Sequence, residues 1–152
     1  MILELTAVGH VRGGRSEPED DGWGGVEARI ELEERFGADA LLGLDAFSHL
    51  EVVYFFHQAD PTHRVYGTRH PRGNPAWPRV GIFAQRGRDR PNGLGVCVCE
   101  IRGVRGRTVH VRALDAIDGT PVLDLKPVMR EFLPRSAVRE PAWAEELMSM
   151  YW

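Results

Sequence analysis

Glycine and proline divide this chain into short apolar segments, and this division limits the possible folds more than any other feature. The sequence has 17 glycines and 10 prolines among 152 residues. Most of the apolar segments between them have the length of a strand and are short for a helix. The segment 26–32 alternates apolar and polar residues strictly, as a half-buried strand does. Many short strands, with turns between them and few helices, predict a mainly β protein, either a barrel or a compact sandwich.

Seven segments are expected to be strands, the segment 50–56 as a buried central one. They are 3–11, 26–32, 50–56, 80–84, 94–101, 108–114 and 122–125. We expect a short helix within 34–44 and a closing helix at 141–151, where Pro141 stands near the first turn. The prolines within 60–78 predict an irregular stretch. Residues 1–152 are therefore expected to form one domain, a small β-barrel of about seven or eight strands with short helices.

Composition places the chain among globular proteins. Hydrophobic residues make up 43% and charged residues 27% of the sequence. No apolar run approaches the ~20 residues that span a bilayer, and the first residues lack the pattern of a signal peptide. Cys97 and Cys99 have no second pair at zinc spacing, so they are expected to be small core residues. We expect a cytoplasmic protein with no membrane partner and no metal site.

Charge is unevenly distributed along the chain. The formal net charge of -3 argues against a generic nucleic-acid binder. Yet residues 63–90 contain seven arginines and one acid, whereas acids gather at 17–21 and 31–34. This asymmetry predicts one basic surface on an otherwise acidic protein. Its arginines either contact phosphate groups or form ion pairs with the acidic segments.

The segment 81–95 reads GIFAQRGRDRPNGLG and is the most distinctive in the chain. An apolar segment ends at Ala84, three arginines follow, and Pro91-Asn92-Gly93 precedes the next apolar segment. Glycine and asparagine adopt backbone angles that other residues avoid, and proline fixes φ. The pattern predicts a shaped loop between two strands. Such a loop either presents its guanidinium groups to a ligand or leaves them solvated.

Three other segments carry side chains that can bind a ligand. His57 and Gln58 follow the predicted strand 50–56, where a strand end can contact a ligand. The turn at 118–120 lies in a stretch with three aspartates, whose carboxylates either cap the turn's own backbone or offer acceptors to a ribose or a cation. These aspartates are Asp115, Asp118 and Asp124. The acidic loop 16–23 has too few ordered ligand positions for calcium and is expected to be solvated.

Together these segments resemble the TrmO (YaeB, TsaA-like) family. The resemblance rests on His57-Gln58, on the Phe-Ala-x-Arg and Arg-Pro-Asn-x-Leu-Gly motifs within 83–95, and on Asp-Gly-Thr-Pro-Val-Leu-Asp-Leu-Lys-Pro at 118–127. The segments 8–12 and 44–50 add to it, and the order and spacing also agree. It covers residues 5–130. This chain departs from the usual family pattern at Gln85, Gly87, Gly93 and Val128.

The resemblance implies a small β-barrel that binds S-adenosylmethionine and assembles as a homodimer. It also implies methylation of N6-threonylcarbamoyladenosine beside the anticodon of certain tRNAs. We expect Phe56 and Ile117 to form the walls of an adenine pocket. The expected cofactor contacts are Asp20, Asp21, Phe56, His57, Gln58, Arg86, Ile117, Asp118, Gly119 and Thr120.

The chemistry of methyl transfer suggests roles for several residues. Displacement at a sulfonium depends on alignment, which supplies on the order of 7–11 kcal/mol in favourable cases. Arg86 suits the cofactor's carboxylate, and Asp118 suits its ribose or amine. A base would help a weakly nucleophilic N6, and Asp124 or His57 could serve. The candidate catalytic residues are Asp124, Arg90 and Asn92. The candidates for contact with RNA are Arg88, Arg90, Asn92 and Lys126.

Other functions stay open at this point. The chain could bind S-adenosylmethionine without catalysis, or methylate a different RNA or a small molecule, because fold resemblance does not decide activity. A plain RNA-binding barrel is a further alternative. That alternative lacks aromatic platforms for bases outside Trp77 and Tyr66.

Overall fold

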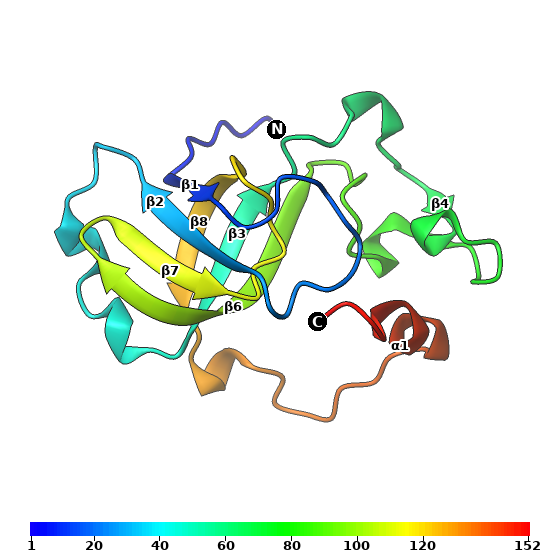
Figure 1. The fold of residues 1–152 in the computed structure, drawn as a ribbon. Coiled ribbons are helices and arrows are strands. Elements are labelled where there is room, and N and C mark those ends of the chain that lie inside the picture. Colours follow the sequence, from blue (N-terminus) through cyan, green and yellow to red (C-terminus); the bar gives the residue numbers. More distant parts are fainter.

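Six antiparallel strands close into a barrel in the computed structural model, which describes residues 1–152 (Figure 1). The strand order around the barrel is β1-β2-β7-β6-β3-β8, and β8 pairs with β1 to complete it. This closure pairs the two edges that an open sheet of these strands would expose. The barrel strands are β1 (Gly9–Arg12), β2 (Glu27–Leu32), β3 (His49–Phe55), β6 (Leu94–Arg105), β7 (Thr108–Arg112) and β8 (Pro121–Pro127).

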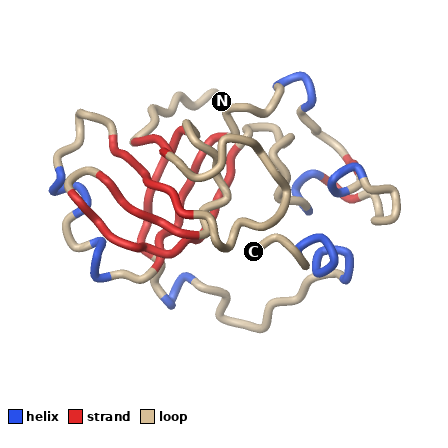
Figure 2. The backbone as a smooth tube through the Cα atoms, in the orientation of Figure 1, coloured by secondary structure: helices blue, strands red, loops and turns tan.

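The other regular elements are short and lie outside the barrel wall (Figure 2). A two-stranded sheet pairs β4 (Thr68–Arg69) with β5 (Val80–Gly81), and α1 spans Ala142–Met148. None of the helices has the length and apolar content that a membrane crossing needs. The single-turn 3₁₀ helices are η1 (Ala38–Leu41), η2 (Leu44–Ala46), η3 (Pro61–His63), η4 (Pro71–Gly73), η5 (Ile82–Ala84) and η6 (Arg130–Phe132).

The mainly β prediction is confirmed, but the predicted seven or eight barrel strands are too many. The segment 3–11 is strand only from Gly9, where it can pair with β2 and β8. The segment 80–84 pairs with β4 over two residues and then turns into η5. The helix expected within 34–44 is two separate 3₁₀ turns. An alternating or apolar pattern predicts that a segment is extended. A strand also needs a hydrogen-bonded neighbour, which the pattern does not predict.

The core is the inside of the barrel. Along β3, Leu50, Val52 and Tyr54 point inward and are buried, while the side chains between them are half-buried. The expectation of a wholly buried central strand is therefore wrong, because a single-layered barrel wall has one outer face. Cys97 and Cys99 are buried and unpaired, as expected, and burial raises the pKa of the Cys99 thiol to about 12. Both thiols act as small apolar groups.

Three long connections meet at one end of the barrel, which we call the loop end (Figure 1). They are residues 13–26 after β1, 56–93 after β3, and 113–120 after β7. The antiparallel pairing places the last residues of these strands beside the first residues of β2, β6 and β8. The segments 16–23, 57–58, 81–95 and 118–120 belong to these connections. Strand topology thus brings motifs that are distant in sequence to the same end.

Two glycines of β6 test how tightly the wall is packed. A Cβ added at Gly95 would lie 2.4 Å from ring atoms of the buried Tyr54, whereas one added at Gly103 would meet open space. We expect Gly95→Ala to lower the free energy of unfolding by about 1–3 kcal/mol. Gly103→Ala is the matched control and should change it by less than about 0.5 kcal/mol. Urea denaturation of the two variants measures both values, and equal losses would contradict this account of the packing.

Candidate functional site

His57 lies beside the turn formed by residues 117–120 at the loop end. The turn closes when Thr120 N–H donates to the Ile117 carbonyl at 3.1 Å, and Gly119 adopts φ +80°. This positive φ is what the third residue of a type II turn requires. A Cβ at Gly119 would lie 3.7 Å from Nε2 of His57. The structure thus brings together the two motifs that sequence analysis placed at a strand end and in an Asp-Gly turn.

Backbone hydrogen bonds attach this turn to the β1–β2 connection. Asp118 Oδ1 accepts from Gly13 N–H at 2.7 Å, so this carboxylate caps a distant loop and not its own turn. Asp118 N–H donates to the Arg15 carbonyl at 2.7 Å, and Gly119 N–H donates to the Val11 carbonyl at 2.8 Å. Both connections are therefore ordered as one unit.

The environment of His57 favours its neutral form. Burial lowers the pKa of His57, the positive charge of nearby His10 lowers it further, and Asp118 opposes both effects. His10 is itself held by Glu33, with 2.8 Å between Nδ1 and Oε1. Neutral imidazole carries a lone pair, so His57 can accept a hydrogen bond or a proton at neutral pH.

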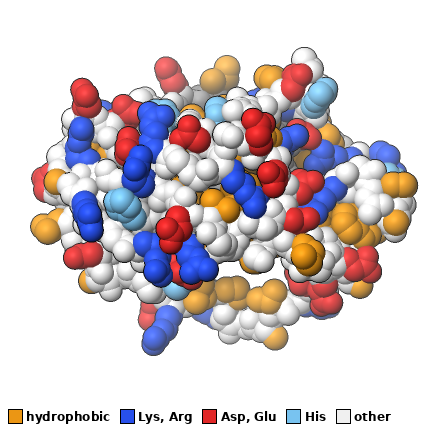
Figure 3. All heavy atoms as spheres, in the orientation of Figure 1, with side chains coloured by type: hydrophobic (Ala, Val, Ile, Leu, Met, Phe, Trp, Pro, Cys, Tyr) orange, Lys and Arg blue, Asp and Glu red, His pale blue; other side chains and the backbone are white.

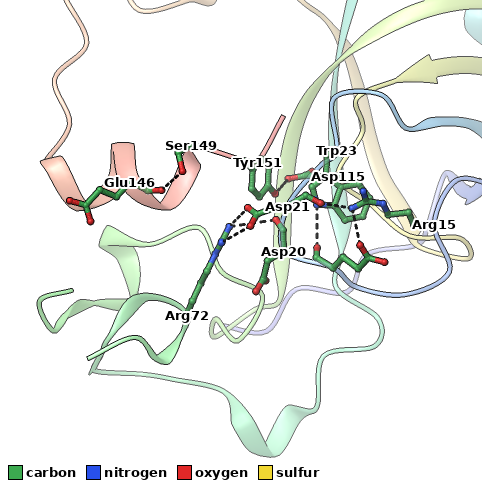
Figure 4. A network of polar contacts seen from close by, with 10 residues as sticks. Arg15, Asp20, Asp21, Trp23, Arg72, Asp115, Glu146, Ser149 and Tyr151 are labelled. Carbon is green, nitrogen blue, oxygen red and sulfur yellow. Dashed lines mark hydrogen bonds and ion pairs between the residues drawn. The ribbon is translucent and has the colours of Figure 1, made fainter. Parts of the chain in front are cut away.

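Ion pairs order the acidic loop, which was expected to be solvated (Figure 4). Arg72 donates to both carboxylate oxygens of Asp21, at 2.8 and 3.2 Å, in a forked arrangement. Arg72 adopts φ +51°, an uncommon backbone conformation for a residue with a side chain. The prediction that the acidic loop is solvated is wrong for Asp21, whereas Asp20 remains exposed.

Arg15 holds the same loop from inside. Its guanidinium donates to the carbonyls of Asp21 and Gly22, each at 2.7 Å, and lies 4.5 Å from the ring centroid of Trp23. Trp23 is buried. An arginine that satisfies two carbonyls and stacks on an indole fixes the path of the loop past Asp20 and Asp21. Sequence analysis did not single out Arg15 or Trp23.

The Asp115 carboxylate accepts from two tyrosines near this loop, and Figure 4 shows it with one of them, Tyr151. Tyr54 donates its hydroxyl hydrogen to Asp115 Oδ1 at 2.7 Å, and Tyr151 donates to Asp115 Oδ2. Burial and the negative charge of Asp115 raise the pKa of both phenols, so both stay protonated donors. Nothing in the sequence indicated Tyr151, because it is far from Tyr54 and Asp115 along the chain.

Arg86 is exposed on the loop before β6. Its Nη2 donates to the Val96 carbonyl at 2.7 Å, so the guanidinium extends along the start of that strand. Arg88 is also exposed and lies 3.9 Å from Asp89, close to the limit for an ion pair. Both keep hydrogen-bond donors for a ligand.

Gln85 and Arg90 brace the loop. Gln85 is buried, and its Nε2 donates to the carbonyls of Arg69 and Val80 at 3.2 and 3.0 Å. Arg90 donates to the Gln85 carbonyl at 3.0 Å, and Arg69 pairs with Asp89 at 2.9 Å. The arginines of residues 63–90 are therefore of both kinds that the sequence left open. Arg69 and Arg72 form ion pairs, whereas Arg86 and Arg88 are exposed.

The remaining predicted cofactor contacts differ in exposure. The Phe56 ring packs edge-to-face on Tyr54, with 5.3 Å between centroids, and is half-buried. Ile117 and Thr120 are buried, and Gln58 is exposed. Phe56 and Gln58 thus have surface to offer a ligand, whereas the side chains of Ile117 and Thr120 shape the turn from inside.

Three further predicted residues, Asn92, Asp124 and Lys126, have no hydrogen bond or ion pair to His57. Asp124 and Lys126 share the outer face of β8, as their alternation predicted, and they form an ion pair. The other Asp124 oxygen accepts from Leu125 N–H at 2.9 Å. Asn92 is exposed on the turn before β6. No group of three or more His, Cys, Asp or Glu side chains is arranged to hold a metal ion.

Known proteins share this fold and these motifs. The family model of the tRNA-methyltransferase O N-terminal domain matches residues 17–132. The chain belongs to the TrmO family. A TrmO crystal structure from Pseudomonas aeruginosa superposes with a TM-score of 0.76 and 26% identity, over 94% of this chain and 62% of that one. The overall fold of this chain is thus similar to that of a solved TrmO structure.

Two relatives show how far the likeness extends along each chain. A tRNA (adenine(37)-N6)-methyltransferase from Mus musculus is 36% identical over 93 residues, which are 61% of this chain and 21% of the mouse protein. A probable S-adenosyl-L-methionine-binding protein from Methanothermobacter thermautotrophicus is 36% identical over 131 residues, 84% of this chain and 90% of that protein. The residues that align with this chain make up about a fifth of the mouse relative and most of the archaeal one.

The lowered pKa of His57 predicts a pH dependence of stability. The unfolded chain has the ordinary value of 6.5, so below that pH it binds more protons than the folded protein. The contribution of neutral His57 to the free energy of unfolding is therefore present above pH 6.5. It is lost as the pH falls toward the pKa of His57 in the folded protein. We expect the stability difference between wild type and His57→Gln to shift against wild type on acidification.

Chemical denaturation at a series of pH values measures this difference. His63→Gln, at an exposed position on η3, is the matched control. If the difference in free energy of unfolding between wild type and His57→Gln stays constant with pH, the pKa of His57 is not lowered in the folded protein.

Proposed function

We propose that this chain binds S-adenosylmethionine at the loop end and transfers its methyl group to N6 of an adenosine in tRNA. The observation that carries the proposal is the junction of His57 with the turn at 117–120, beside the ordered loop 20–23, in a TrmO-family barrel. The mouse relative is named a tRNA (adenine(37)-N6)-methyltransferase. We propose N6-threonylcarbamoyladenosine as the acceptor.

The residues at the loop end fit this cofactor chemically. S-adenosylmethionine has an amino group, a carboxylate, ribose hydroxyls and an adenine ring. Arg86 offers an exposed guanidinium for the carboxylate, and Asp20 and the second oxygen of Asp118 offer acceptors for the amino group and hydroxyls. Gly119 has no side chain at its approach to His57, so a ligand can lie against the backbone there. Phe56 contributes aromatic surface.

The cofactor supplies an electrophilic methyl group when bound. This chain supplies binding and alignment, and we assign the proton acceptor to His57. In the transfer the methyl–sulfur bond would break, with S-adenosylhomocysteine as the leaving group, and the proton of N6 would pass to the neutral imidazole of His57, whose pKa is lowered by burial. Asp124 is the other candidate base, but its carboxylate is paired with Lys126 on the outer wall.

For RNA we propose contacts from Arg88 and Lys126, whose side chains are exposed. Arg90 holds the loop by its bond to the Gln85 carbonyl, so we assign it to positioning of its neighbours. Asn92, exposed at the end of the same loop, is placed to join the RNA contacts. Contacts of exposed arginine and lysine with phosphates give salt-dependent affinity.

A second candidate function is cofactor binding without catalysis. The archaeal relative, of which this chain covers 90%, is named a probable S-adenosyl-L-methionine-binding protein. Incubation with cofactor labelled in its methyl group and bulk tRNA separates the two. Label on the RNA supports the methyltransferase, and binding without label on the RNA supports the alternative.

Two variants of the arginine loop separate cofactor binding from RNA binding. We expect Arg86→Ala to weaken S-adenosylmethionine binding by roughly tenfold or more, because a charge-assisted hydrogen bond is lost. Arg88→Ala, two residues away on the same loop, should leave cofactor affinity unchanged and weaken tRNA binding. Calorimetry with the cofactor and filter binding with tRNA measure the two affinities. Unchanged cofactor affinity in Arg86→Ala would remove Arg86 from the site.

We further propose that the outer face of β3 and β6 joins two copies of this chain. Leu94, Val96 and Val98 point outward with 36%, 40% and 43% of their surface exposed. Phe55 and Val53 are the cross-strand neighbours of Leu94 and Val96 on β3, and Glu51 lies opposite Val98. A group of outward apolar residues on adjacent strands is typical of an interface between subunits.

The oligomeric state tests this proposal. We expect wild type to be a dimer in light scattering and Val98→Glu to be a monomer, because a buried unpaired charge opposes association. Leu42→Glu, at an exposed apolar residue of the opposite barrel end, is the control and should leave the dimer intact. A monomeric wild type would reject the proposal.

A further inference from the structure

Residues 133–152 lie outside the region that the family model matches, yet they return to the loop end. The chain leaves β8 at the opposite end of the barrel, and residues 131–142 are exposed throughout. Figure 3 shows an opening between this stretch and the barrel. The chain then forms α1 and reaches Tyr151 beside Asp115 (Figure 4). We call residues 141–152 the strap.

Specific contacts hold the strap at two places on the loop end. In α1, Glu146 Oε2 accepts from the indole N–H of Trp77 at 2.8 Å. After α1, the carbonyls of Met150 and Tyr151 accept from Gly22 N–H at 2.9 Å and Trp23 N–H at 2.7 Å. The barrel strands pair fully among themselves without the strap.

The end of the strap packs closely against the backbone at Gly24. A Cβ at Gly24 would lie 2.7 Å from the backbone carbonyl carbon of Trp152, so the two backbones touch. The Tyr151 ring also packs edge-to-face on Trp152, with 4.9 Å between centroids. A contact of this kind orders the segment 22–24 and, through it, the neighbouring Asp20 and Asp21.

Tyr151 also acts on the carboxylate behind the loop. Both oxygens of Asp115 accept from phenol hydroxyls, and neither accepts from an arginine or lysine. Without the Tyr151 hydroxyl, Asp115 Oδ2 would lose its donor.

We propose that Tyr151 is a positioning residue of the cofactor site. It holds the acidic loop, with Asp20 and Asp21, through the strap backbone, and its hydroxyl bond to Asp115 fixes the strap at this place. This inference rests on the proposed function, and it adds to the site a segment that follows the residues matched by the family model.

The test compares Tyr151→Phe with wild type. We expect the dissociation constant for S-adenosylmethionine to rise about tenfold, as loss of one hydrogen bond to a charged group implies. In the methylation assay, KM for the cofactor should rise while kcat at saturation stays near wild type, because Tyr151 does not touch the acceptor. Tyr66→Phe removes an exposed hydroxyl and is the matched control.

Two further readouts separate positioning from a general loss of stability. Thermal denaturation should give Tyr151→Phe a midpoint close to that of wild type. Amide hydrogen exchange should be faster at Gly22 and Trp23, the two donors to the strap. Unchanged cofactor affinity, or a loss of affinity equal to that of a variant destabilised elsewhere in the core, such as Val109→Ala on β7, would overturn the proposal.

If the proposed function is wrong, binding and amide exchange give a different combination of results. If wild type does not bind S-adenosylmethionine, the cofactor role of Tyr151 falls with that function. The ordering of the acidic loop by the strap is still decided by amide exchange. Faster exchange at Gly22 and Trp23 in Tyr151→Phe supports it, and unchanged exchange rejects it.

Discussion

The pairing of β8 with β1 is the constraint on which the rest of this structure depends. It closes six antiparallel strands into a barrel and leaves one inner face for the core. Because neighbouring strands run in opposite directions, alternate connections emerge at the same end. The three long connections all emerge at one end, and every segment that we assign to cofactor binding belongs to that end.

Polar contacts between connections then turn flexible loops into a defined surface. Asp118 binds the backbone of Gly13, Arg72 binds the carboxylate of Asp21, and Gln85 bridges two backbone carbonyls beneath the arginine loop. The first two contacts join different connections, and the third braces the arginine loop within the connection 56–93. A surface ordered in this way loses less conformational entropy when a ligand binds, which suits a methyl transfer that depends on alignment.

Local pattern predicted much of this protein correctly. The alternation of 26–32 and the inward cysteines of β6 identified real elements, and the motifs around His57 and Gly119 identified real neighbours. The errors have a common cause. The segments 3–11 and 80–84 are apolar enough for strands but mostly lack partners in the barrel, and the acidic loop is ordered by Arg72 from another connection. That residues 1–152 act as one domain stays a prediction.

The sequence by itself determined the β class, the positions of most turns and the family motifs. All of these depend on the conformational preferences of single residues and on short-range alternation of polarity. Only the tertiary structure decided which carboxylates are free. Asp21 is bound by Arg72 and Asp115 by two tyrosines, while Asp20 stays exposed. Whether a charged group is available depends on neighbours brought near it by strand closure, and no local pattern encodes those neighbours.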